Sequence, residues 1–558
     1  MGALSLNWAY GVFLTTVFGF GLFVLYGARH QSWGRLISPG PSFLSARQEV
    51  TWVPLGLSLY ASFMGNWVLY LPPVAGALYG WPGVIGYALS SSLPYLLLLW
   101  LSSRIYSSSK GAFCSCDFLA ARFGLPSQVA AALVSLSMMF VSLSSELTTV
   151  GLSMKALTRG AFPLPCAVIL VAVIPLLYVL LGGLKCCIIS DVVQAVVIVF
   201  LFIPFVIFLI CKGGPGGPWA PPTLEGLEIE AVSFTPSECA VAGAVLVLSV
   251  WPVFLCDQGI WQRVWAARSV GDMQRGFVLA SVLVGGSVLL FGTAGLVCLT
   301  REEALMGASL FTFAAERLPV EWVVMLCVLA VACVTSSVDT YQAAIVSLIG
   351  KDLEKFRLSF NWARLAMVVV NVPAVLLALY QVSLLALYMV SNFLCAVLAG
   401  PFVVTVHRGI TALGFLGGLG CAAVALSLCG VVSALVSGIP FSFAFFAPED
   451  ISSVPYLVSF IVVPVVGAVA AAAISALDRH CSPTKTTTPP SASAKSPDGQ
   501  TAPQSAGSEA SQQQPHAASS NSTRSSNNDG CTDTPQSHAV ELGAVKSSAP
   551  GTEASCCV

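Results

Sequence analysis

The stretch VACVTSSVDTYQAAIVS, residues Val331–Ser347, places hydroxyl side chains and one carboxylate inside a long apolar run. Thr335, Ser336, Ser337 and Asp339 supply these groups, and apolar segments on both sides put them at membrane depth. An Asp at the centre of a membrane helix costs roughly 2.5–3.5 kcal/mol on insertion scales, and such groups usually persist because they handle an ion or a substrate. We therefore predict a cation site at this stretch.

The composition indicates an all-α polytopic membrane protein. Of 558 residues, 56% are hydrophobic and 9% are charged, whereas an average soluble domain has roughly 25% charged residues. A spanning helix needs about 20 predominantly apolar residues. About thirteen such segments occur, approximately over residues 8–28, 50–72, 81–103, 129–151, 163–181, 187–211, 240–260, 277–299, 320–348, 363–382, 384–406, 411–433 and 454–477. The main partner predicted from composition is thus the lipid bilayer.

Several function classes are excluded by the same composition. A formal net charge of -1 gives no signal for a nucleic-acid partner. The eighteen Cys are scattered through apolar segments without metal-ligand spacing. The five His all fall in loops, at span ends or in the C-terminal region, so no nucleophile or metal constellation forms within the membrane. We predict that the protein is not an enzyme.

The distribution of Lys and Arg predicts the orientation in the membrane. Sixteen of them fall in the alternate loops that begin after the first span, against five in the opposite loops, and cytoplasmic loops accumulate these residues. The N-terminus is therefore expected outside and the C-terminus inside, in the plasma membrane. Residues 212–239 then form an acidic extracellular loop, and the Ser-, Thr- and Gln-rich residues 482–558 form a disordered cytoplasmic tail.

Two spans contain helix-breaking residues at corresponding places, five helices apart. Span 50–72 contains Gly65, Asn66 and then Pro72–Pro73, and span 240–260 contains Trp251–Pro252 followed by Asp257, Gln258 and Gly259. Interrupted helices at equivalent positions in two halves indicate an inverted-repeat transporter whose binding site lies at the midplane. The alternative is a pair of ordinary kinked membrane helices.

The polar residues of these spans allow more than one interpretation. The hydroxyls of Ser336 and Ser337 could bind a cation, or could bond back to carbonyls one turn earlier. Asp339 could assist the ion, bind a proton, pair with a cationic substrate or act as a structural acceptor. Glu146 could face a cavity or lie near the outer end of its span with Lys155.

Asp191 is a further acidic residue close to the start of a span. It lies near the cytoplasmic end of the sixth span, where an acid in the first turn of a helix is favoured by the helix dipole. Capping and a secondary ion-release site are the two interpretations.

Four motifs resemble the sodium/solute symporter family over roughly residues 45–410. They are GLSLYASFMGNWVLYLPP (Gly56–Pro73), LGGLKCCIISDVVQ (Leu181–Gln194), FLCDQGIWQRVWAARSVGDMQRG (Phe254–Gly276), and the opening stretch with KDL (Lys351–Leu353) after it. The resemblance implies ten core helices in two inverted five-helix repeats, residues 50–211 and 240–406. Residues 1–49 would then supply a preceding helix and loop, and residues 407–481 two peripheral helices.

The resemblance also implies a sodium site. By motif position, it would comprise carbonyls of Ala61, Met64 and Cys333 and the hydroxyls of Ser336 and Ser337. The order Ser-Ser-Val-Asp is similar to that of proline- and choline-type carriers, which favours a functional Asp339. Proline-type members carry an acid where Phe63 stands here, so the resemblance assigns neither proline nor a first-helix carboxylate to this chain.

Together these observations predict a secondary active symporter that couples sodium entry to import of a small polar solute. Asp339 and Asp191 are the predicted coupling or ion-relay residues, and the predicted substrate contacts are Asn66, Trp67, Glu146, Trp251 and Gln258. A proton-coupled symporter, a sodium-independent facilitator or channel, and a solute sensor are the alternatives. The sequence selects neither the solute nor an oligomeric state.

Overall fold

Apolar runs of this length fold as helices because lipid offers no hydrogen-bond partner to an open backbone. The computed structural model describes residues 2–29, 43–44, 46–108, 112–212, 234–305, 307, 309–359, 361–437, 443–446, 448 and 450–481. Within these ranges the secondary structure is helical apart from one isolated bridge between Val50 and Ala267. The predicted tail, 482–558, and most of the predicted acidic loop, 212–239, lie outside the described residues.

Twelve helices of the described part are long and apolar enough to cross a membrane. They are α1 (Leu6–Arg29), α5 (Leu71–Ser108), α7 (Leu125–Leu157), α8 (Leu164–Gly182), α9 (Leu184–Lys212), α10 (Pro236–Cys256), α12 (Val270–Cys298), α15 (Val320–Ser347), α17 (Asn361–Leu379), α18 (Leu384–Val404), α19 (Ala412–Ser437) and α21 (Val454–Cys481). The expected span 50–72 is the interrupted one, made of α4 (Trp52–Phe63), η1 (Asn66–Leu69) and the start of α5. The polytopic all-helical prediction is confirmed.

Helix α5 contains the end of that interrupted span and the whole of the next one. Gly80 breaks its helical geometry with φ 65° and ψ −148°, so the chain changes direction there. Shorter helices connect or flank the spans: α6 (Ser115–Phe123), α11 (Gln258–Ala266), α13 (Arg301–Leu305), α14 (Leu310–Arg317), α16 (Gly350–Lys355) and α20 (Phe443–Phe446).

The helix packing is reciprocal between two sets of five spans. The first set is α4–η1, α5, α7, α8 and α9, and the second is α10–α11, α12, α15, α17 and α18. The first helix of each set packs on the second helix of the other, as α4 on α12 and α10 on α5. The third helix of each packs on the fifth of the other, as α7 on α18 and α15 on α9. An odd number of spans per set gives the two sets opposite orientations, as expected of an inverted repeat.

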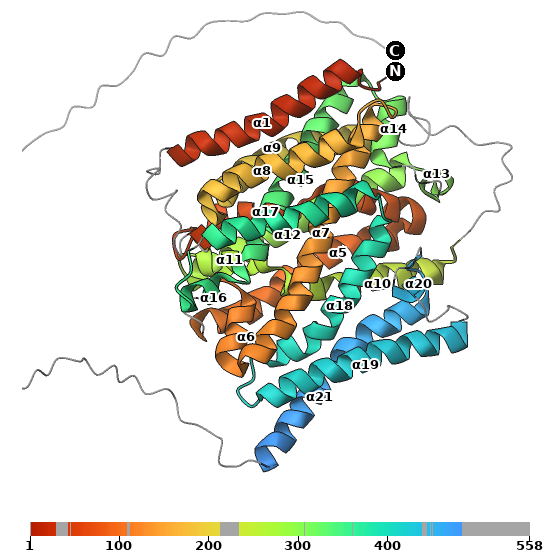
Figure 1. The fold of residues 1–558 in the computed structure, drawn as a ribbon. Coiled ribbons are helices and arrows are strands. Elements are labelled where there is room, and N and C mark those ends of the chain that lie inside the picture. Colours follow the sequence, from red (N-terminus) through yellow and green to blue (C-terminus); the bar gives the residue numbers. More distant parts are fainter. Residues whose placement is uncertain are drawn as a thin grey trace, which may run out of the picture. The chain divides into compact units, whose positions relative to one another are not determined.

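The remaining spans lie at the periphery of this core. Helix α1 packs on α15, α8 and α9, whereas α19 packs mainly on α21, which also contacts α18. Figure 1 shows α1 at one side of the helical bundle and α19 with α21 at the opposite side. Exposed apolar residues such as Val424, Leu428 and Val469 cover these outer helices, as expected of a lipid-facing surface.

Helix α15, which contains the stretch Val331–Ser347, lies at the centre. In the most apolar segment of α15, 83% of the residues are buried, whereas the buried share of the corresponding segment in each of the other spans is 28–67%. It contacts α7, α9, α4, α8 and α17. The hydroxyls and the carboxylate of this stretch therefore face protein on every side.

Candidate ion and solute site

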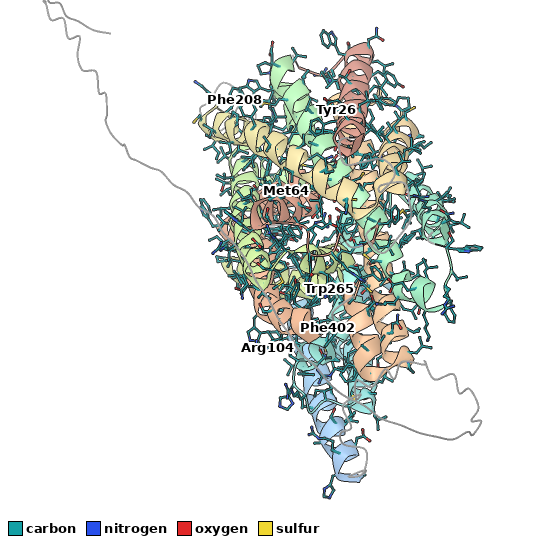
Figure 2. All side chains as sticks on the ribbon, turned by 90° about the vertical axis from the view of Figure 1, so that its left-hand side faces the viewer. Tyr26, Met64, Arg104, Phe208, Trp265 and Phe402 are labelled. Carbon is teal, nitrogen blue, oxygen red and sulfur yellow. The ribbon has the colours of Figure 1, made fainter. Side chains whose placement is uncertain are left out.

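The first helical break lies at Met64–Gly65. Helix α4 ends at Phe63, Met64 takes ψ 65°, Gly65 is extended, and η1 begins at Asn66. The break was predicted, but Pro72–Pro73 are not its cause, since they lie in the first turn of α5 where missing N–H groups are tolerated. Figure 2 places the fully buried Met64 well inside the bundle. The interruption therefore leaves free backbone carbonyls of α4 inside the protein.

Helix α15 meets this break through its serine pair. The Ser337 hydroxyl donates to the Ser62 carbonyl at 3.0 Å. Ala61 and Met64 flank Ser62 and are fully buried, and Cys333 lies one turn before Ser337 on α15 and is also buried. The five predicted ligand residues thus come from two adjoining segments, which meet at the hydrogen bond between Ser337 and Ser62.

Ser336, the other hydroxyl of the pair, points toward α9. Its Oγ donates to Asp191 Oδ1 at 2.5 Å. Asp191 Oδ2 accepts a hydrogen bond from the Ser58 hydroxyl of α4 at 2.5 Å. Asp191 is the eighth residue of α9 and does not cap that helix, so it joins α4, α9 and α15 directly beside the predicted ion site.

Arg263 pairs with Asp191 and corrects one expectation from the sequence. The charge distribution had placed Arg263 in a cytoplasmic loop, but it lies on α11 with its guanidinium 2.6 Å from the Asp191 carboxylate and fully buried. The guanidinium also donates to Ser58 at 2.7 Å and to Thr340 at 2.8 Å. The loop count therefore falls by one, from sixteen to fifteen against five. Arg263 follows Asp257 by only six residues, and this short spacing is the signal that could have placed it on α11, the helix that starts at the second break.

Asp339 belongs to the same polar network but faces α8. Its Oδ2 accepts from the Tyr178 hydroxyl at 2.6 Å, and its Oδ1 from the Thr340 hydroxyl at 3.4 Å. Thr340 also accepts from Arg263. Asp339 is thus linked to Asp191 through Thr340 and Arg263, and no direct contact joins it to Ser336 or Ser337 in the described part of the chain.

Glu146 lies on the other side of the first break. Its Oε2 accepts the backbone N–H of Asn66 at 2.8 Å, and the Asn66 amide donates to Ser153 at 2.7 Å. A Cβ on Gly65 would come within 1.9 Å of Glu146 Oε1, so only glycine leaves room for the carboxylate. The carboxylate therefore lies beside the break, and the described ion pairs do not include one between Glu146 and Lys155.

The second helical break lies at Asp257. Helix α10 ends at Cys256, and the Asp257 carboxylate accepts the N–H groups of Gly259 at 2.8 Å and Ile260 at 3.4 Å, which starts α11. The predicted break is confirmed, although Pro252 lies within α10 and is not the breakpoint.

A cavity lies next to the first break, and one of the predicted substrate contacts lines it. It is lined by Phe63, Trp67, Leu71, Tyr87, Ser142, Leu246, Ser249, Val250, Val253, Tyr341, Leu385, Tyr388, Met389 and Asn392. Trp67 is one of these lining residues, whereas Asn66 and Glu146 are not among them and are hydrogen-bonded to each other beside the break. Tyr341 was missed, although it follows Ser337 by one turn on α15 and so shares its face.

Trp251 and Gln258 are not brought to this cavity. The Gln258 amide is saturated by other partners, because it accepts from Ser115 at 2.9 Å and donates to Ser135 at 2.9 Å and to Cys256 at 3.0 Å. Trp251 is half-buried on α10 and packs against the apolar core instead. Gln258 thus connects α6 and α7 to the start of α11.

Comparison with known proteins identifies the family. The model of the sodium:solute symporter family matches residues 43–412. The chain belongs to this family. The match includes both helical breaks and the whole of α15, and it ends at the first residue of α19, so nearly all of α19 and the whole of α21 lie beyond it.

Individual symporter relatives are distant. The chain is 23% identical over 371 residues to the spermidine transporter DUR31 of Candida albicans, covering 64% of this chain and 68% of that protein. It is 27% identical over 340 residues to a sodium/glucose cotransporter of Vibrio parahaemolyticus, covering 56% of this chain and 58% of that one. Membership of the symporter family makes the chain a transport protein and not an enzyme.

The fold is also that of a solved symporter. A sodium-coupled sialic acid symporter in a substrate-bound, outward-open state superposes with a TM-score of 0.63 at 15% identity, covering 84% of this symporter and 98% of that chain. At that identity the likeness extends to the fold alone.

Proposed function

We propose that this symporter couples sodium entry to the import of a small polar solute by alternating access. The observation that supports the proposal most directly is the contact of the Ser337 hydroxyl with the Ser62 carbonyl at 3.0 Å across the break of α4. Hard cations take several oxygen ligands, and a broken helix facing an intact one supplies carbonyl and hydroxyl oxygens together.

The proposed sodium ligands are the carbonyls of Ala61, Met64 and Cys333 and the hydroxyls of Ser336 and Ser337. All five residues are buried to at least 99%. This set of ligands fits a monovalent cation, because its oxygens are neutral and one carboxylate lies next to them. That carboxylate belongs to Asp191, which accepts a hydrogen bond from Ser336. Sodium bound there would hold α15 against α4, which are helices of different repeats.

Coupling follows if sodium binds one conformational state better than the other, since equal affinities would shift no equilibrium. Asp191 and Arg263 join α4, α9, α11 and α15 beside the ion site. We propose Asp191 as the group that receives the ion on its way to the cytoplasm, and Asp339 as a more remote member of the same relay.

The central cavity is the proposed solute site. Trp67 lines it, and Asn66 and Glu146 adjoin it at the break. The cavity encloses about 70 Å³, which is room for a few water-sized groups, so the solute or the part of it bound there is small. The two relatives are named for different solutes, spermidine and glucose, and kinship alone does not select between them.

A panel of radiolabelled uptake measurements in proteoliposomes tests the proposal. Urea, proline, choline, pantothenate, glucose and spermidine are each supplied with an inward sodium gradient, with a proton gradient and with neither. Accumulation that requires sodium supports the proposal. Accumulation driven only by the proton gradient would establish a proton symporter. Saturable or unsaturable flux without accumulation would establish a facilitator or channel. Binding without flux would establish a sensor.

N-terminus-outside orientation and location in the plasma membrane are part of the same proposal. With Arg263 removed from the count, the excess of Lys and Arg in the predicted cytoplasmic loops is still threefold. Import from outside the cell requires the ion and solute sites to open first to that side.

A further inference from the structure

Aromatic rings make up about a third of the lining of the central cavity. Five of its lining residues are aromatic, namely Phe63, Trp67, Tyr87, Tyr341 and Tyr388. They come from α4, η1, α5, α15 and α18, so five elements each contribute one ring. Ser142, Ser249 and Asn392 are the polar residues among the lining set. Three of the rings are tyrosines with hydroxyl groups, so the surface offers several π faces together with hydrogen-bonding groups.

The rings are arranged as walls at an angle to one another. Phe63 and Trp67 meet edge to face, with centroids 5.4 Å apart and planes at 87°. Tyr87 adjoins Trp67 with a centroid distance of 6.0 Å and an angle of 30°. The Trp67 indole is fixed by its N–H, which donates to the Phe63 carbonyl at 3.3 Å. A preformed corner of this kind attracts a cation through the negative faces of its rings.

A carboxylate adjoins the same walls. Glu146 follows the cavity-lining Ser142 by one turn of α7. A Cβ built on Gly65 would touch both Glu146 Oε1 at 1.9 Å and Trp67 Cδ1 at 2.7 Å, so the carboxylate and the indole flank one point.

Glu146 lacks a cationic partner among the described residues. The ion pairs there are Lys185–Glu49, Arg263–Asp191, Arg317–Glu303 and Lys351–Glu354. Its one hydrogen bond in that part of the chain uses Oε2 and the Asn66 N–H, whereas Asp191 has both a guanidinium and two hydroxyls. A buried carboxylate without a counter-charge is costly. A bound cation would supply that charge.

From this arrangement we infer that the solute is an organic cation, whose ammonium group binds among the rings of the cavity and pairs with Glu146. The inference deepens the proposed function and rests on the cavity being the solute site. Primary and quaternary amines both satisfy it, since each presents a compact positive charge to π faces. An anion does not, because the charge nearest to the rings is the negative one of Glu146.

Equilibrium binding to the full-length protein, purified in detergent, tests the inference without a sodium gradient. The probes are radiolabelled putrescine and radiolabelled choline, with unlabelled glucose and urea as competitors. We expect at least one amine to bind and neither neutral solute to displace it. Glu146→Gln should raise the Kd of the amine by at least about tenfold, since a buried charge pair loses one partner. Glu321→Gln, which alters an exposed carboxylate on α15, should leave the Kd unchanged.

Ring substitutions provide a second measurement that does not depend on the carboxylate. Tyr388→Phe keeps the π face and should retain amine binding, whereas Tyr388→Leu removes it and should weaken binding by about threefold to thirtyfold. Equal binding by these two variants would overturn the aromatic part of the inference.

The outcomes separate this inference from the sodium proposal. Binding of neither amine, or an unchanged Kd in Glu146→Gln, overturns the organic-cation inference even if sodium drives uptake of a neutral solute. A change of sodium affinity alone in Glu146→Gln also overturns it, because the carboxylate would then serve a coupling ion. Amine binding that needs Glu146 supports it, even if uptake proves independent of sodium.

Discussion

Arg263 and Asp191 form an ion pair in which a guanidinium nitrogen lies 2.6 Å from a carboxylate oxygen and neither side chain is exposed. Arg263 lies on α11, behind the second break, and Asp191 on α9 is bonded to Ser58 of α4, ahead of the first break. The pair therefore links the interrupted helices of both repeats beside the serine pair of α15. Any rearrangement of the repeats has to accommodate this buried contact.

Removal of one partner of this pair should strongly destabilise the protein. Arg263→Gln leaves the Asp191 carboxylate buried without its counter-charge, and we expect a loss of about 3–5 kcal/mol in the free energy of unfolding. Thermal unfolding of the purified protein in detergent measures the effect. The double variant Asp191→Asn with Arg263→Gln should recover part of the loss, because no uncompensated charge remains.

Lys185→Gln is the matched control for that experiment. Lys185 pairs with Glu49 at 2.7 Å, but both side chains are partly exposed to solvent, and exposed pairs contribute about 0–1 kcal/mol. If Arg263→Gln unfolded no more readily than Lys185→Gln, the buried pair would not be a structural link.

The serine pair of α15 should determine the sodium dependence of uptake. Ser337→Ala removes the hydroxyl that meets the Ser62 carbonyl, and the sodium concentration for half-maximal uptake should rise by about tenfold, equivalent to about 1.4 kcal/mol. The double variant with Ser336→Ala should raise it further. Ser347→Ala is the control, since that buried hydroxyl bonds only within its own helix, to the Ala344 carbonyl at 2.6 Å. A sodium dependence that survives the double substitution would refute the assignment.

The fold and the positions of the two breaks could be predicted because both depend on local sequence. Long apolar runs with few charges specify spanning helices, and Gly65 and the polar residue Asp257 mark where a helix stops. The prolines were misleading as markers. Pro72 and Pro73 lie where a helix begins, and Pro252 lies within a helix that continues to Cys256.

Contacts between distant segments could not be predicted from one sequence. Arg263 is a charged residue that follows a predicted span, as is typical of a loop. Only the folding of the chain brings its guanidinium to Asp191, which lies 72 positions earlier in the sequence. Gln258 adjoins a break as predicted, but its amide is used by Ser115 and Ser135 of other helices. Tyr87 and Tyr388 reach the cavity from positions in α5 and α18 that lie outside both breaks in the sequence. The serine pair was found because hydroxyls beside a carboxylate are conspicuous in an apolar helix.

Gly65 should tolerate no side chain. Its backbone is extended, with φ −71° and ψ 172°, so Gly65→Ala introduces no backbone strain and acts through its Cβ alone. That atom would overlap Glu146 Oε1, and overpacking of this kind costs typically about 1–3 kcal/mol. We expect a lower unfolding temperature and loss of solute uptake. Gly286→Ala on α12, where a Cβ meets no atom within 4 Å, should change neither, and equal behaviour of the two variants would argue against a tight contact at the break.

Two exposed cysteines report the orientation of the chain. Cys211 lies at the end of α9, next to the predicted extracellular loop, and Cys481 lies at the end of α21, next to the predicted cytoplasmic tail. A membrane-impermeant maleimide added to intact cells should label the protein through Cys211, so Cys211→Ser should reduce labelling and Cys481→Ser should not. After permeabilisation both substitutions should reduce it, which confirms that each thiol is reactive. The reverse pattern in intact cells would place the N-terminus inside, and the proposed import would then have to begin from the opposite face of the membrane.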